Sequence, residues 1–284
     1  MFKDQKSQSK SAKSAKSAIL AIEKELKAVK RQEAALHHAA VTSKVPEWKL
    51  SLMDKIPQKV SENLEKAFCK AFAAVFEKGS NLIEKTYHPD TIRKDFAIRE
   101  FAFQVRSDRK SLKKIQVDAK AANRRNLAIT SVEGIGLGAF GIGLPDLVVF
   151  VGVLLKGIYE VALRYGFDYD SQKEQYFILK LMETSMLKGK EWEDANAAID
   201  RWISGETVVS FRKEEVNEQL NRTAGVFAAD MLLFKFIQGL PVAGVIGGAG
   251  NPFYYKKVLT YAELKYRKRY LSGLLQKEIS GQSI

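Results

Sequence analysis

The chain has little cysteine, histidine or proline: one cysteine, three histidines and six prolines among 284 residues. The single thiol, Cys69, excludes an internal disulfide bond, and no second thiol is present for a cysteine-based zinc or iron–sulfur site. The chain also has no His pair at i, i+4 with a Glu and no Gly-x-Ser-x-Gly sequence, which removes two common hydrolase motifs. We therefore predict no metal site, no cofactor and no catalytic residue, and we interpret Cys69 as a small buried apolar side chain.

Signals for β-structure are also scarce, because no Asn-Gly or Asp-Gly dipeptide marks a hairpin. Helical periodicity dominates instead. One helix is predicted between Pro57 and Gly79, with apolar residues at three- and four-residue spacing. Asp90 can cap a second helix, whose apolar stripe we assign to Phe96, Phe101 and Val105. Ser171 and Glu174 have the spacing of a capping box at the start of another helix.

These patterns predict an all-α protein in two parts. Residues 46–284 form a single compact helical domain built around Gly-rich helical hairpins. Residues 1–45 form a basic, low-complexity extension that is flexible or partly helical. Within the extension, Ile19, Ile22, Leu26 and Val29 share one helix face, which could dock on the body, on a partner helix or on lipid. We expect this extension to pack poorly.

The formal net charge of +13 is concentrated in three segments. Residues 1–31 carry nine basic residues and three acids, residues 93–125 carry eleven and four, and residues 253–270 carry six and one. Such segments attract polyanions, either nucleic acid or the anionic leaflet of a membrane. The N-terminus lacks the apolar stretch of a signal peptide, so we expect a cytoplasmic protein.

Residues 134–157, GIGLGAFGIGLPDLVVFVGVLLKG, are apolar and crowded with glycine. The bare GxGxxG pattern is present, but no strand precedes it as a dinucleotide site requires. The length suits a bilayer core of about 30 Å, yet Asp146 near the middle costs about 2.5–3.5 kcal/mol there, and Pro145 interrupts the helix. We favour two shorter helices that meet near Leu144, with Pro145 in the first turn of the second and Asp146 at its positive dipole end.

The glycines then have a packing role. Gly134, Gly138 and Gly141 lie at i, i+4 and i+7, so a neighbouring helix backbone can approach closely. Residues 239–257 repeat the combination of proline and glycine, and we expect the two segments to pack together. The predicted packing or hinge glycines are Gly134, Gly136, Gly138, Gly141, Gly143, Gly244, Gly247, Gly248 and Gly250.

These two Gly-rich regions resemble the signature regions of the EcsC family of bacterial proteins. The resemblance rests on Leu144, Pro145 and Asp146 after the glycines, on the turn Tyr165, Gly166, Phe167 and Asp168, and on residues 239–271, and it spans roughly residues 50–275. It implies work at or near the cytoplasmic membrane, because the founding member is encoded beside the subunits of an ABC exporter. It implies no reaction.

Asp146 and Asp230 are the acids in the most apolar surroundings, and we interpret both as structural. Asp168, in the family-like turn, is a further polar candidate. The C-terminal helix interleaves tyrosines with cations, as interfacial helices and single-strand-binding surfaces both do. The side chains predicted to contact an anionic surface are Lys113, Lys114, Arg124, Arg125, Lys256, Lys257, Lys265, Arg267, Lys268 and Arg269.

The sequence therefore predicts a non-enzymatic protein, peripheral to the inner membrane, that binds anionic lipid or a membrane transport complex through basic helices. Nucleic-acid binding is the main alternative. A membrane-inserting or pore-type protein and a hydrolase with an unrecognised site are further alternatives.

Overall fold

Helices account for every regular element in the part of the chain that the structure describes. This computed structural model describes residues 2–42, 56–76, 83–116, 145–206, 212–237 and 250–280. The helices are α1 (Phe2–Thr42), α3 (Gln58–Ala74), α5 (Pro89–Arg106), α7 (Pro145–Arg164), α8 (Gln172–Met186), α9 (Gly189–Ile203), α10 (Lys213–Ile237) and α11 (Gly250–Ile279), with a further helical stretch at residues 109–116. The predicted all-α fold is confirmed.

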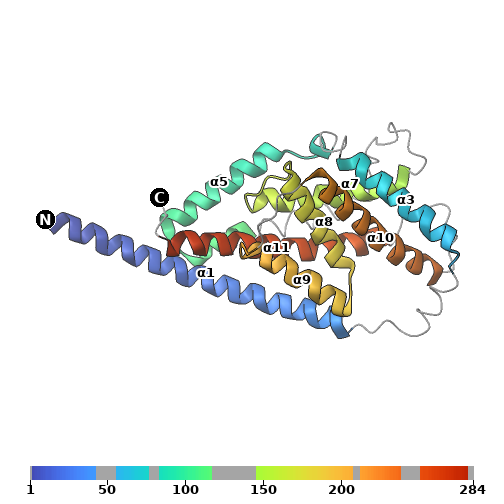
Figure 1. Cartoon of the computed structure of the whole chain (residues 1–284). Helices are drawn as coiled ribbons and strands as arrows, with labels where there is room; N and C mark the ends of the chain where they lie inside the picture. The colour runs from blue at the N-terminus through green and yellow to red at the C-terminus, as the bar shows by residue number, and fades with distance from the viewer. Residues whose placement is uncertain are drawn as a thin grey trace.

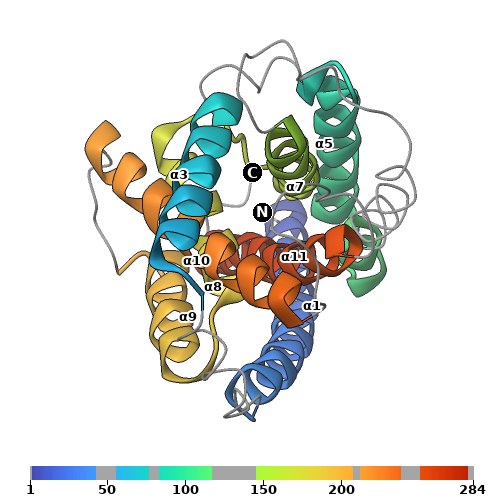
Figure 2. The same ribbon diagram turned by 90° about the vertical axis from the view of Figure 1, so that its right-hand side faces the viewer.

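The C-terminal helix α11 is the centre of the molecule. It packs against α1, α7, α8 and α9, and Figure 2 shows the other helices arranged around it. Tyr254, Val258, Ala262 and Tyr266 are all buried, and buried positions occur on every side of α11. A helix enclosed in this way has no broad solvent face, so its sequence lacks a one-sided apolar pattern.

The N-terminal helix α1 is a single long helix that lies along the body. Its first turns project past the other helices at the left of Figure 1, and its later turns pack against α11 and α9. Ile22 and Val29 are fully buried, and Leu26 packs against the same core. The predicted apolar face therefore docks on the body, and the expectation of poor packing is wrong for residues 18–29.

An aromatic cluster joins four helices on the side of the molecule away from α1. Phe68 and Phe72 come from α3, Phe150 from α7, Phe227 from α10 and Tyr254 from α11, with neighbouring ring centroids 5.8–6.5 Å apart. Such edge-to-face and tilted pairs add about 0.5–1.5 kcal/mol each beyond the area that they bury. The periodic apolar residues predicted for α3 thus form part of the main core.

Cys69 lies on α3 beside this cluster, at the partly buried edge of the core. Burial, with a smaller contribution from Glu65, raises the pKa of its thiol. A thiol with a raised pKa is a poor nucleophile at neutral pH. Cys69 is therefore a packing residue, although it is less buried than the sequence suggests.

The start of α8 shows half of the predicted capping box. Ser171 Oγ accepts a hydrogen bond of 3.2 Å from the backbone N–H of Glu174. The Glu174 carboxylate does not return to Ser171, because it bonds Tyr266 Oη and Arg269 of α11 instead. Glu174, the third residue of α8, therefore connects α8 to α11.

The predicted glycine hinges fall mainly in segments that lie outside the described residues. These are Gly134, Gly136, Gly138, Gly141, Gly143, Gly244, Gly247 and Gly248. Pro145 is the first residue of α7 and Gly250 the first of α11, so Pro145 stands at the helix start predicted for it. The side chain of Asp146 is also outside the described part.

Across the helices that the structure describes, none is both long enough and apolar enough to be a transmembrane span.

Candidate functional site

The family-like turn between α7 and α8 has a structural explanation for each of its four residues. Tyr165 is buried, and Gly166 adopts a φ of +78°, which is the left-handed conformation of a helix C-cap. The backbone N–H of Phe167 donates to Ala162 O at 3.0 Å, which completes the cap. An added Cβ at Gly166 would lie 2.5 Å from Cζ of Phe96 on α5, so only glycine fits both the backbone and the neighbour.

Asp168 fastens the same turn to α5. One oxygen, Oδ1, accepts from the backbone N–H of Tyr169 at 3.0 Å and from the Arg93 guanidinium at 3.2 Å. The Asp168 side chain is 63% exposed, so the ion pair with Arg93 is worth little by itself. Asp168 therefore orients the turn.

Asp230 has its partner on α11. Tyr254 Oη donates to Asp230 Oδ2 at 2.9 Å. Burial and the Asp230 charge together raise the pKa of Tyr254, so the phenol stays protonated and remains a donor. The hydrogen bond joins α10 to α11, and no group of three or more His, Cys, Asp or Glu in the described ranges is placed to hold a metal ion.

Four of the predicted surface cations of α11 face the interior instead. Lys265 is fully buried, and its Nζ bonds Glu33 of α1 and Asp200 of α9, the latter at 2.6 Å. Lys268 Nζ bonds the same two carboxylates at 2.7 and 2.8 Å. Burial alone would raise the pKa of Glu33, but the charges and hydrogen bonds of the two lysines outweigh it and hold this pKa below its ordinary value.

Arg267 and Arg269 complete this internal set. Arg267 bonds Glu25 of α1, whose other oxygen accepts from Arg109 Nε at 2.5 Å. Arg269 pairs with Glu174 and lies over the Phe167 ring at 4.1 Å from the centroid. The prediction that Lys265, Arg267, Lys268 and Arg269 contact an anionic surface is therefore wrong, because each is paired with carboxylates inside the helical bundle.

The tyrosines of α11 are internal as well. Tyr254, Tyr255, Tyr261, Tyr266 and Tyr270 are all at most 7% exposed. The alternation of tyrosine and cation on α11 thus comes from core packing and internal charge pairing. It supports neither an interfacial helix nor base stacking at these positions.

The other predicted surface cations have varied positions. Lys256 is exposed, whereas Lys257 is half-buried and its Nζ lies 6.0 Å from the Phe253 ring centroid. Burial lowers the pKa of Lys257. Lys113 and Lys114 are exposed on the helical stretch 109–116. Arg124 and Arg125 lie outside the described residues.

The structure reveals an exposed apolar face on α5 that the sequence analysis missed. Ile98, Phe101 and Val105 are 67%, 64% and 66% exposed, and we call these three residues the α5 stripe. Phe96, which the sequence predicts to share a stripe with Phe101 and Val105, packs on Tyr270 in the core instead. At about 100° per residue, Phe101 and Val105 lie roughly 140° and 180° round the helix from Phe96, whereas the α5 stripe follows i, i+3 and i+7. That spacing is the signal that could have identified it.

Exposed cations lie close to the α5 stripe along the chain. Lys94 lies on the same face at i−4 from Ile98, Arg106 ends α5, and the stretch 109–116 follows directly. The left-handed Ser107, with a φ of 50°, breaks the helix between them. The basic flank of the stripe consists of Lys94, Arg106, Lys110, Lys113 and Lys114, all of them exposed.

A second group of exposed cations lies on the outer face of α1. It consists of Lys13, Lys16, Lys24, Lys27, Lys30 and Arg31. Here the apolar residues face inward, so α1 presents charge without a comparable apolar patch; Leu20, at 47% exposed, is the main exception among residues 13–31. The region of α5 and residues 109–116 combines both features and is the candidate functional site.

The profile of the EcsC protein family matches residues 21–271. The match begins inside the segment that the sequence analysis sets apart as an extension. No curated protein and no solved structure matches the chain significantly.

Proposed function

The chain belongs to the EcsC protein family, and from that membership we propose that it is a peripheral membrane protein that binds anionic lipid through the α5 stripe and its basic flank. The observation that carries the proposal is the exposure of Ile98, Phe101 and Val105 along one face of α5. Apolar side chains bordered by lysine are typical of helices that lie in the interface plane of a membrane.

The free energies involved indicate that membrane binding requires both the α5 stripe and its basic flank. Full burial of one large aliphatic or aromatic side chain is worth about 1.5–3 kcal/mol. Since the three stripe side chains are about two thirds exposed, their transfer into lipid would supply roughly 3–6 kcal/mol. This free energy is comparable with that from insertion of a single acyl chain, which by itself gives only marginal membrane binding. The five cations of the basic flank would add about 1 kcal/mol each near an anionic surface, so stable binding needs the charge of the lipid.

Vesicle flotation of the full-length protein tests the proposal. We expect binding to phosphatidylcholine vesicles that contain about one third phosphatidylglycerol, and loss of binding on vesicles of phosphatidylcholine alone or at high salt. Absence of binding to the anionic vesicles at low salt would refute the proposal.

Two sets of variants locate the surface. The triple variant Ile98→Gln/Phe101→Gln/Val105→Gln should lose most binding, whereas Leu20→Gln/Val41→Gln/Ile279→Gln, which removes exposed apolar side chains elsewhere, should retain it.

The second set tests the cations. Lys110→Gln/Lys113→Gln/Lys114→Gln should weaken binding more than Lys59→Gln/Lys66→Gln/Lys70→Gln on α3, where the lysines are also exposed. If a surface variant and its control lost vesicle binding to the same extent, the assignment of the membrane surface would be contradicted.

Nucleic-acid binding is the competing function. Its best support was the mixture of tyrosine and cation on α11, and those tyrosines are buried. A mobility shift with single- and double-stranded probes separates the two: binding of nucleic acid but not of anionic vesicles would favour the competing function.

A further inference from the structure

A groove on the side of the molecule away from α5 carries the opposite charge. It has a volume of about 730 Å³ and is lined by α3, α8, α9 and α10. In Figure 2 these helices stand to the left of α11 and α5 stands to the right. The groove is therefore a separate surface from the candidate membrane site.

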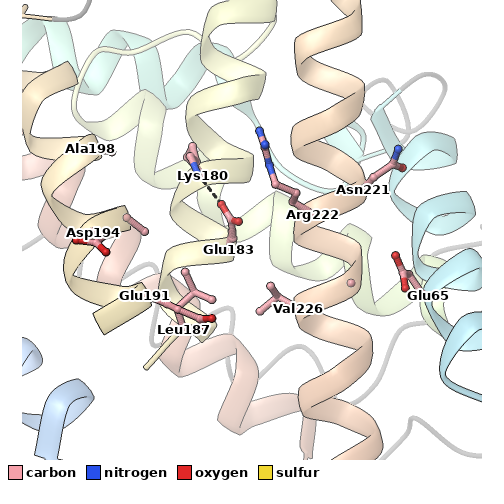
Figure 3. Close-up of a pocket in the computed structure, with 12 residues that line it drawn as sticks. Glu65, Lys180, Glu183, Leu187, Glu191, Asp194, Ala198, Asn221, Arg222 and Val226 are labelled. Carbon is pink, nitrogen blue, oxygen red and sulfur yellow. Dashed lines mark hydrogen bonds and ion pairs between the residues drawn. The ribbon is translucent and has the colours of Figure 1, made fainter. Parts of the chain in front are cut away.

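The groove has an uncharged floor. Leu187 and Val226 lie between α8 and α10 in Figure 3, and Ala195 and Ala198 of α9 extend the apolar lining. An added Cβ at Gly225 of α10 would meet the Glu65 carboxylate of α3 at 3.5 Å, which is an ordinary van der Waals contact. The floor thus offers an uncharged surface between α8, α9 and α10.

Exposed carboxylates stand at both ends of the groove. Glu65 lies at the α3 end, and Glu191 and Asp194 lie at the α9 end. Asp194 pairs with Lys190 at 2.9 Å, but the Lys190 side chain is 77% exposed, and an exposed pair of this kind competes weakly with a new partner.

The carboxylate of Glu183 is already engaged. Glu183 accepts from Lys180 and from Gln219, each at 2.8 Å. Arg222 donates to the neutral amide oxygen Gln219 Oε1 at 3.2 Å, so this exposed guanidinium keeps its positive charge in the groove. The carboxylates left to meet a ligand are therefore Glu65, Glu191 and Asp194, separated by an apolar floor.

We propose that this groove is a docking site for a lysine-rich amphipathic helix of a partner protein. Such a helix would place its apolar face on Leu187 and Val226 and its lysines against the carboxylates at either end. The acidic groove is notable in a chain of net charge +13, because long-range electrostatics repel a cationic partner from most of the surface. Attraction must then come from the groove itself, which gives the site its specificity.

Fluorescence anisotropy tests the proposal with the full-length protein in solution, without vesicles. The probe is a labelled synthetic amphipathic helix of about 18 residues, long enough to form five turns, composed of leucine, alanine and lysine. We expect saturable binding of this peptide and none of a matched peptide in which glutamate replaces lysine. Because no lipid is present, the result is independent of the proposed membrane function.

Neutral variants assign the binding to the groove. Glu65→Gln/Glu191→Gln/Asp194→Asn should weaken the peptide about tenfold or more, since each carboxylate contact contributes to affinity. The control Glu62→Gln/Glu214→Gln/Glu218→Gln removes three exposed carboxylates of α3 and α10 outside the groove and should change affinity less than about twofold. Gly225→Met provides a steric test, because the longer side chain would occupy the groove floor.

Three outcomes would overturn the proposal. The first is absence of binding of the lysine peptide to the wild-type protein. The second is equal weakening by the groove variant and its control. The third is displacement of the peptide by an equal concentration of free spermidine, which would make the groove a polyamine site in which the apolar face of the peptide has no role. Loss of peptide binding in the groove variant and in Gly225→Met, with binding retained in the control, supports the proposal.

Discussion

Phe96 of α5 occupies the space that a side chain at Gly166 would need. An added Cβ would lie 2.5 Å from Phe96 Cζ, and the glycine φ of +78° is itself unfavourable for any other residue. The contact fixes the turn after α7 against α5, which carries the α5 stripe on its opposite face. The position of the candidate membrane surface thus depends on a glycine far from it in the sequence.

Replacement of this glycine should be costly. We expect Gly166→Ala to lower the free energy of unfolding by about 2–4 kcal/mol, as left-handed strain and a steric clash act together. Gly205→Ala is the matched control, because Gly205 has a φ of +80° and no neighbour within 4 Å of the added Cβ, and it should cost only about 1–2 kcal/mol. Urea denaturation followed by circular dichroism measures both. Similar losses for the two variants would show that the Phe96 contact is unimportant.

Two tyrosines of α11 should respond differently to loss of their hydroxyl groups. Tyr254→Phe removes the hydrogen bond to Asp230 and should cost about 1–3 kcal/mol, since the acceptor is charged. Tyr270 Oη is buried and makes no hydrogen bond within the described residues. Tyr270→Phe should therefore be neutral or slightly stabilising. The thermal midpoints of the two variants check this, and a larger loss for Tyr270→Phe would contradict it.

The buried Lys265 should be needed for docking of α1. Its replacement by methionine leaves Glu33 and Asp200 with only Lys268 as their partner among the contacts described. We expect Lys265→Met to lower the free energy of unfolding by about 2–4 kcal/mol, which is somewhat less than for an isolated buried pair because Lys268 remains. Lys190→Met breaks the exposed pair with Asp194 and should leave the urea midpoint unchanged. No loss in Lys265→Met would show that the charge cluster does not hold α1.

Acid should weaken the same cluster through Glu33. The fold holds the pKa of Glu33 below 4.5, so the unfolded chain takes up this proton first as the pH falls. The stabilisation that Glu33 contributes is therefore complete at pH values above its ordinary pKa of 4.5. It is lost as the pH falls through the lowered pKa of the folded state. Glu33→Gln should be less stable than the wild type at neutral pH, and the difference should shrink in this acidic range. Urea unfolding across the range measures it, and a constant difference would contradict the linkage.

Much of the architecture was predictable from the sequence, because helix periodicity and caps are local. The apolar spacing of α3, the helix start at Pro145 and the Ser171 cap all depend on residues within one or two turns. The side of α1 that docks could also be identified, since Ile22 and Val29 recur on one face. These features are determined by the chain itself, before any distant contact forms.

Tertiary structure alone decided which charges face solvent. Lys265 and Arg267 belong to a basic run that is indistinguishable from a surface patch in sequence, but the carboxylates that pair with them are on α1 and α9, far along the chain. Likewise Phe101 and Phe96 are both apolar residues of α5. Only tertiary contacts, of α5 with α7 and of Phe96 with Tyr270 of α11, separate a core ring from an exposed one. The reason is physical: burial and ion pairing depend on partners that are brought together by folding, whereas helix formation depends mainly on near neighbours.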